Sequence, residues 1–184
     1  MTDMAGQDIG ERLRPLVWGG AGALLLAPWV AMQLGAPGVH WTAADFLVMG
    51  VLLGALAGLF ELGLRLDRRW SYRMGIWLAA VIAFLTIWVN LAVGMLGSEG
   101  HPLNLMFAGV IAIAVLGALL ARGRAPGMAR AMLAAGLAQL LAVAIALPMG
   151  FQRHELAMTA LFALPWLVAS ALFHAARQVD AGGA

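Results

Sequence analysis

Three polar residues stand inside long apolar stretches, where an ionisable or hydrogen-bonding side chain is costly and therefore informative. They are Glu61, Asn90 and Gln139. A carboxylate and two amides along one path could conduct a proton, a cation or a neutral solute across a membrane. A structural interpretation competes with this one, because Arg65 follows Glu61 in the order that favours a helical ion pair. Amides at such depth commonly hydrogen-bond between helices.

A second group of polar residues falls at the ends of the apolar stretches or in the connectors between them. It comprises Asp45, Glu99, His101, Asn104, His154 and Glu155. Imidazoles and carboxylates bind zinc or copper, so this group is the candidate site for such a metal on the outer face. None of its members shows a metal-binding spacing such as H-x-x-x-H or H-E-x-x-H. We therefore predict ordinary interfacial polar residues, with no resident metal and no cofactor.

No catalytic constellation is recognisable in the chain. The sequence lacks a P-loop, a G-x-S-x-G motif and paired aspartates at spanning depth. It also contains no Cys, which excludes disulfides, thiolate metal sites and a cysteine nucleophile. We therefore expect a protein that is not an enzyme.

The segments that carry these residues are suited to lipid rather than to water. Of the 184 residues, 63% are hydrophobic and only 11% are charged, whereas a soluble domain carries about 25% charged residues. The mean hydropathy is +0.91. The basic residues lie at the ends of apolar stretches, where lipid headgroups explain them. We therefore predict a lipid bilayer, and not nucleic acid, as the partner of the surface.

A helix that spans a bilayer needs about 20 mostly apolar residues. Six stretches meet or nearly meet this requirement: Leu16–Leu34, Ala44–Leu64, Met74–Leu96, Asn104–Ala121, Ala129–Gly150 and Leu156–Ala175. The predicted fold is an all-α, polytopic bundle of six transmembrane helices over residues 16–175. Residues 1–15 and 176–184 form a cytoplasmic N-terminal segment and a cytoplasmic tail.

The arginines predict the orientation of this bundle. All eleven basic residues are arginines, and in the six-helix topology only Arg153 falls on the outer side. The others share one side: Arg12, Arg14, Arg65, Arg68, Arg69, Arg73, Arg122, Arg124, Arg130 and Arg177. Basic residues are retained in the cytoplasm, so both termini are expected there. The arginine-only, Ala- and Gly-rich composition favours a bacterial source, and hence an inner membrane.

Two local patterns predict how the helices are shaped and joined. Gly50, Gly54 and Gly58 form a doubled G-x-x-x-G face, which favours close packing with another copy or another membrane protein. The connector GSEGHPLN is predicted to be a rigid turn, with Gly97 ending one helix and the Asn104 side chain capping the next.

The segments HWTAADFLVMGVLLGALAGLFELGLR and WVNLAVGMLGSEGHPLNLMFAG carry a recurrent pattern. It reads W-T-x-x-D-F, E-L, V-N-L-A-V-G and G-S-E-x-x-P-x-N in this order. The pattern resembles a family of small bacterial multi-pass membrane proteins that has no assigned activity. The resemblance implies a membrane location and draws attention to the residues at the matching positions: Trp41, Thr42, Asp45, Phe46, Glu61, Asn90, Gly94, Gly97, Ser98, Glu99, Pro102 and Asn104.

Three functions are compatible with these observations. The first is a non-enzymatic accessory, assembly or binding component of the membrane. The second is a small-solute or ion transporter that uses Glu61, Asn90 and Gln139. The third is an outer-face protein that binds copper or zinc. A cavity that gathers these polar residues would favour transport or ligand binding, whereas separate contacts would favour the accessory role. Only a structure can show which arrangement is present.

Overall fold

The computed structural model describes residues 2–66 and 69–181, with side chains over 13–66 and 69–177. These residues form helices and connecting turns without a strand. The chain divides into two compact units, Met1–Arg68 and Arg69–Ala184. The prediction of an all-α protein with six helices long and apolar enough to span a membrane is confirmed. The six helical spans are Leu13–Gln33, Ala43–Leu66, Trp70–Ala92, Pro102–Ala121, Ala125–Met149 and Arg153–Arg177.

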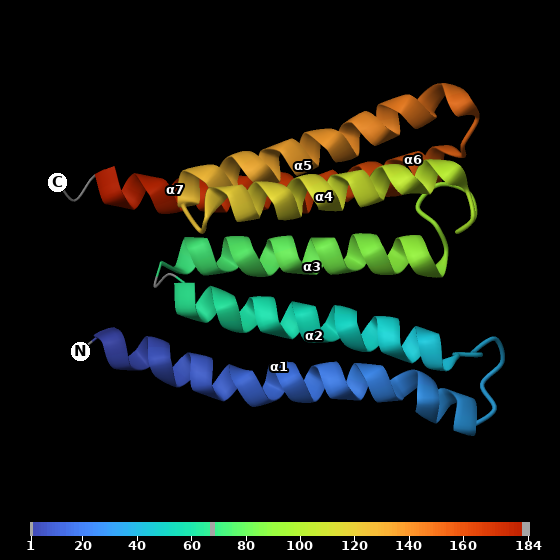
Figure 1. Cartoon of the computed structure of the whole chain (residues 1–184), viewed down its shortest axis with the longest axis horizontal. Helices are drawn as coiled ribbons and strands as arrows, with labels where there is room; N and C mark the ends of the chain where they lie inside the picture. The colour runs from blue at the N-terminus through green and yellow to red at the C-terminus, as the bar shows by residue number, and fades with distance from the viewer. Residues whose placement is uncertain (1, 67–68, 182–184) are drawn as a thin grey trace. The chain divides into compact units, whose positions relative to one another are not determined.

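The first unit is an antiparallel helical hairpin of α1 (Thr2–Gln33) and α2 (Ala43–Leu66) (Figure 1). Helix α1 continues without a break through Pro15 and Pro28. A cap defines the start of α2, because the Asp45 carboxylate accepts hydrogen bonds from the Thr42 amide at 2.7 Å and the Thr42 hydroxyl at 2.8 Å. The Thr42 hydroxyl in turn accepts from the Asp45 amide. A T-x-x-D sequence therefore anchors the hairpin turn.

The second unit contains the remaining helices (Figure 1). Its elements are α3 (Trp70–Ala92), η1 (Pro102–Asn104), α4 (Leu105–Ala121), α5 (Ala125–Ala146), η2 (Leu147–Met149), α6 (Arg153–Leu161) and α7 (Ala163–Ala181). Helix α7 packs most extensively against α5 and α3, while α4 packs against α5. Helix α3 contacts α4 much less than it contacts α7, and a groove lies between α3 and α4.

The core of the second unit combines large rings with small residues. Tyr72, Phe107, Trp166 and Phe173 are fully buried. The Phe173 ring lies 3.0 Å from the position that a Cβ would take at Gly75, so the two helices approach over a glycine. Without a hydrophobic force between helices in lipid, such close packing supplies much of the association energy.

The third and sixth spans differ from the predicted helices in ways that have a local cause. The third span ends at Ala92 rather than Leu96, because Gly94 takes a left-handed conformation (φ +78°) and turns the chain. Gly94, and not Gly97, therefore allows the helix to end. The sixth span is divided at Phe162, between α6 and α7. Pro165 explains this division, since its ring clashes with the carbonyl of the residue four positions earlier, which is Leu161.

Gly117 on α4 should be intolerant of a side chain. A Cβ at this position would lie 2.6 Å from the Ala131 Cβ on α5, so Gly117→Ala must push the helices apart. We expect a loss of about 1–3 kcal/mol, the usual cost of overpacking. The measurement is the free energy of unfolding in mixed micelles. Gly109→Ala on the same helix is the control, because no neighbour lies within 4 Å of its Cβ position. Equal effects of the two substitutions would contradict the packing described.

Candidate functional site

The connector between α3 and α4 is organised by one side chain, that of Asn104. Its Oδ1 accepts hydrogen bonds from the amides of Met95 (3.2 Å) and Leu96 (3.0 Å). Its Nδ2 donates to the carbonyls of Leu96 (3.3 Å) and Ser98 (2.7 Å). Asn104 is only 6% exposed, so these four bonds are largely shielded from water. They satisfy backbone groups that would otherwise be buried without partners.

The structure corrects the role predicted for Asn104, which was to cap the helix that follows it. The Asn104 side chain makes no capping bond to α4. His101 instead caps the preceding 3₁₀ turn, where its Nδ1 accepts from the Leu103 amide at 3.3 Å. The turn at η1 gives the first amides of α4 carbonyl partners, as the Leu105 amide bonds to Leu103 and Pro102. The Asn104 carboxamide is therefore free to bond to the connector.

Gly94 packs closely against the Asn104 side chain and the Ser98 backbone. A Cβ at Gly94 would lie 2.6 Å from the Ser98 carbonyl group and 2.8 Å from the Asn104 Nδ2. The positive φ and the lack of space both require glycine here. The pattern N-x-x-x-G followed by G-S-E-x-x-P-x-N in the sequence thus encodes one folded turn.

Asn90 connects α3 to this turn. Its Nδ2 donates to the Asn104 carbonyl at 3.0 Å. Its Oδ1 is buried and has no hydrogen-bond partner among the described residues. A buried acceptor without a partner costs about 1–3 kcal/mol, so this oxygen marks a place where a donor would be bound favourably.

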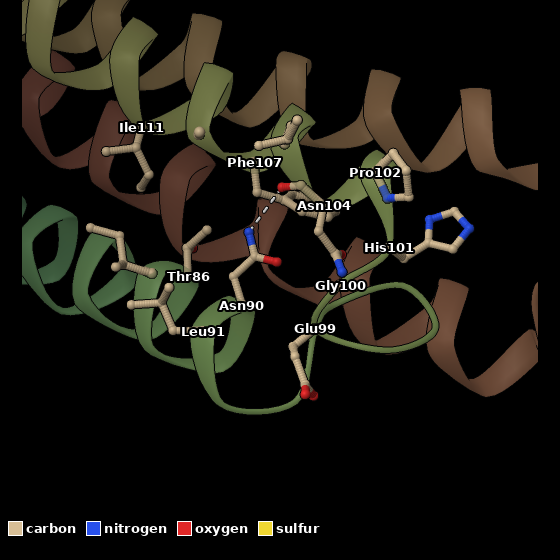
Figure 2. A pocket seen from close by; sticks show the side chains of 13 residues that line it. Thr86, Asn90, Leu91, Glu99, Gly100, His101, Pro102, Asn104, Phe107 and Ile111 are labelled. Carbon is tan, nitrogen blue, oxygen red and sulfur yellow. Dashed lines mark hydrogen bonds between the residues drawn. The ribbon is translucent and has the colours of Figure 1, made fainter. Parts of the chain in front are cut away.

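These residues border a pocket between α3, the connector and α4, with a volume of about 660 Å³. Figure 2 shows Asn90 directed toward the backbone of Asn104, with the side chains of Glu99 and His101 extending away from this pair. Most of the wall is apolar, including Leu91, Phe107 and Ile111. Ligand pockets typically measure about 300–1,000 Å³ and combine apolar walls with a few polar groups. The pocket has this character.

Gln139 belongs to a different part of the same unit and does not line this pocket. It is fully buried, and its Nε2 donates to the Thr159 carbonyl at 3.0 Å. The Thr159 hydroxyl donates to the Met95 carbonyl at 2.9 Å. Gln139 therefore joins α5 to α6, and Thr159 joins α6 to the connector. A bond between helices is the structural role weighed for a buried amide.

Glu61 belongs to the first unit, and the predicted ion pair with Arg65 is confirmed. A second arginine, Arg14 of α1, also lies 3.0 Å from the same carboxylate oxygen. Glu61 therefore ties the two helices of the hairpin together. In the same unit, the Cβ position of Gly50 is 3.7 Å from Leu25, whereas Gly54 and Gly58 have no neighbour from the hairpin within 4 Å.

The outer-face group is only partly brought together. Glu99, His101 and Asn104 line the pocket, while Asp45 caps α2. Glu155 caps α6 by accepting from the Gln152 amide at 3.2 Å, and His154 is exposed on that helix. Across residues 13–66 and 69–177, whose side chains are described, no three His, Cys, Asp or Glu side chains gather closely enough to hold a metal ion. The structure thus offers no support for the copper or zinc hypothesis.

Comparison with known proteins identifies no relative. No family model matches the chain, and no curated protein or solved structure matches it. The class defined by the fold is a multi-pass helical membrane protein. The resemblance stated above remains a prediction.

Substitution of Asn104 should loosen the connector. Asn104→Leu leaves the buried amides of Met95 and Leu96 without acceptors, at a cost of about 1–3 kcal/mol each. We expect faster hydrogen–deuterium exchange at residues 93–100 in nanodiscs, with little change in α5. Ser98→Ala is the control, since Asn104 bonds the Ser98 backbone and not its exposed side chain. Unchanged exchange in Asn104→Leu would refute the organising role of Asn104.

Proposed function

We propose that this chain is a non-enzymatic binding protein of a bacterial inner membrane, and that it holds a small amphiphilic molecule in the pocket between α3 and α4. The observation that carries the proposal is the buried, unpartnered Asn90 Oδ1 beside a largely apolar pocket. A ligand with an apolar body and a hydroxyl or amine donor would satisfy both features.

The charge of the side chains at the pocket indicates which charge the ligand's head group carries. Glu99 contributes a negative charge to its border, and no Arg is among the residues that line it. A neutral or cationic head group is therefore favoured over an anionic one. Leu91, Phe107 and Ile111 provide the apolar wall against which a hydrocarbon or ring system would lie. Burial of such a group contributes about 25 cal/mol per Å².

Binding without chemistry is favoured by the side chains at the pocket. Asn90 and Asn104 are amides whose roles are to hydrogen-bond the backbone, and neither is a proton donor or acceptor in catalysis at neutral pH. Glu99 and His101 extend from the connector in directions away from the asparagine pair (Figure 2). A rigid turn with one buried, unpaired hydrogen-bond acceptor beside an apolar pocket suits recognition.

Filling the pocket should displace the ligand. The experiment is extraction and mass spectrometry of small molecules that co-purify with the protein from its native membrane. Ile111→Trp projects a large ring from the wall of the pocket, and we expect at least about a tenfold loss of the bound molecule, equivalent to 1.4 kcal/mol. Asn90→Leu should reduce the amount by a similar factor, because it removes the acceptor.

Ile113→Trp is the matched control on the same helix. Ile113 is 40% exposed and is not among the residues that line the pocket, so its substitution should leave the co-purified amount unchanged. If wild-type protein released no small molecule beyond those released by Ile111→Trp, the binding proposal would be wrong.

The proposed orientation, with both termini in the cytoplasm, is tested by single cysteines. The chain has no native Cys, so each introduced thiol is the sole target of a membrane-impermeant maleimide. In intact spheroplasts, Gly100→Cys in the α3–α4 connector should be labelled, whereas Gln178→Cys should be labelled only after lysis. The reverse pattern would invert the topology. The Gly100 site tolerates a side chain, as no neighbour lies within 4 Å of its Cβ position.

A further inference from the structure

The opposite end of the second unit carries two adjoining recesses that the pocket between α3 and α4 does not involve. The α5–α7 groove has a volume of about 760 Å³, and the connector recess beside the α4–α5 turn has one of about 870 Å³. Both are lined by Pro126, Arg130 and Arg177, so they share a wall. This common wall is basic.

Four arginines and one histidine surround these two recesses. Arg130, His174 and Arg177 line the α5–α7 groove, and Arg69 and Arg124 join Arg130 and Arg177 around the connector recess. The residues that line them include no Asp and no Glu. The two carboxylates of this unit whose side chains are described, Glu99 and Glu155, lie at the other ends of the helices. Among the described side chains, those that line the two recesses therefore carry positive charge and no negative charge.

Backbone groups line the connector recess and position two of its arginines. Helix α5 begins at Ala125 and α4 ends at Ala121 in this wall, so the positive end of one helix dipole and the negative end of the other meet there and largely offset each other. Arg69 is held across the unit, with its Nη1 donating to the Ala176 carbonyl at 2.6 Å. Arg130 is likewise positioned, with its Nε donating to the Pro126 carbonyl at 3.2 Å. Among the described residues, Arg130 bonds through its Nε alone, so its terminal N–H donors remain available to an anion.

The groove continues from the arginines along apolar side chains. Leu133 of α5 and Leu167 of α7 line its wall further from the charged end. Small residues lie between the two helices, where the Ser170 hydroxyl donates to the Ala129 carbonyl at 2.8 Å. An anion-binding end that passes into an apolar channel along spanning helices has the polarity of a phospholipid, with its head at the arginines and its chains beside the leucines.

We propose that these adjoining recesses bind the phosphate head group of an anionic phospholipid, with an acyl chain in the α5–α7 groove. Arginine is suited to this role, because its planar group forms paired hydrogen bonds with phosphate oxygens and stays charged. Basic pockets between spanning helices are a recurrent form of lipid head-group site. A general excess of arginine at one membrane face explains neither the shared wall nor the apolar continuation. The site requires no assumption about the pocket between α3 and α4.

The test is native mass spectrometry of the purified full chain in detergent, titrated with phosphatidylglycerol. We expect the first phosphatidylglycerol molecule to bind more tightly than further phosphatidylglycerol molecules. It should also bind more tightly than phosphatidylcholine. The double variant Arg130→Gln with Arg177→Gln should weaken this binding about 30-fold, since each arginine near a lipid surface contributes about 1 kcal/mol. Ala171→Trp, which blocks the α5–α7 groove without changing the charge, should weaken it as well.

Two matched controls distinguish a specific lipid site from general electrostatic attraction between the protein and the anionic lipid. Arg73→Gln with Arg122→Gln removes the same charge from residues that line neither recess, and Ala175→Trp places the same ring one turn from Ala171. Both should bind phosphatidylglycerol as the wild type does. Equal losses in the controls and the test variants would overturn the site, as would undiminished binding in the test variants.

A third arm distinguishes the source of the phosphate. Inorganic phosphate and glycerol 3-phosphate carry the head-group chemistry without the chains, and we expect neither to displace the tightly bound lipid. Displacement by either one would assign the recesses to a soluble phosphate compound and overturn the lipid assignment. Thermal unfolding of each variant, measured in parallel, identifies any that fail to fold.

Discussion

The carboxamide of Asn104 is the interaction on which the second unit depends most directly. The chain leaves α3 at Ala92 and reaches α4 at Leu105, and between them the Met95 and Leu96 backbone is buried. Water at a helix end would ordinarily satisfy such groups, but these lie inside the protein. One amide side chain, with two donors and an acceptor oxygen, meets the requirement of four backbone groups at once. The pocket between α3 and α4 has its shape because this turn is held in place.

From that turn, hydrogen bonds extend through the rest of the unit. Asn90 attaches α3 to the Asn104 carbonyl, and Thr159 attaches α6 to the Met95 carbonyl. Gln139 extends the connection to α5. In a bilayer each such interhelical hydrogen bond contributes about 0.6 kcal/mol on average. Their main effect is therefore to determine which faces of the helices pack together. Close packing over Gly75, Gly117 and Gly136 then supplies dispersion energy.

Much of the architecture could be predicted from sequence, because a bilayer imposes a length and an apolar composition on each helix. The pairing of Glu61 with Arg65 followed from spacing alone. The role of Asn104 could not be derived in this way. Its position before an apolar run predicts a helix cap, and only the three-dimensional course of residues 93–98 shows that the same side chain faces the connector. The participation of Arg14 with Glu61, and the gathering of Arg69 with Arg177, likewise depend on contacts between distant segments.

The division of the sixth span at Phe162 separates two sets of contacts. The last spanning segment consists of two helices, because Pro165 interrupts the backbone hydrogen bonds that would join them into one. The shorter helix, α6, contacts the α3–α4 connector through Thr159, while the longer helix, α7, carries His174 and Arg177 at the other end. The break thus lies between the part of the span that contacts the turn beside the pocket and the part that lines the basic recesses.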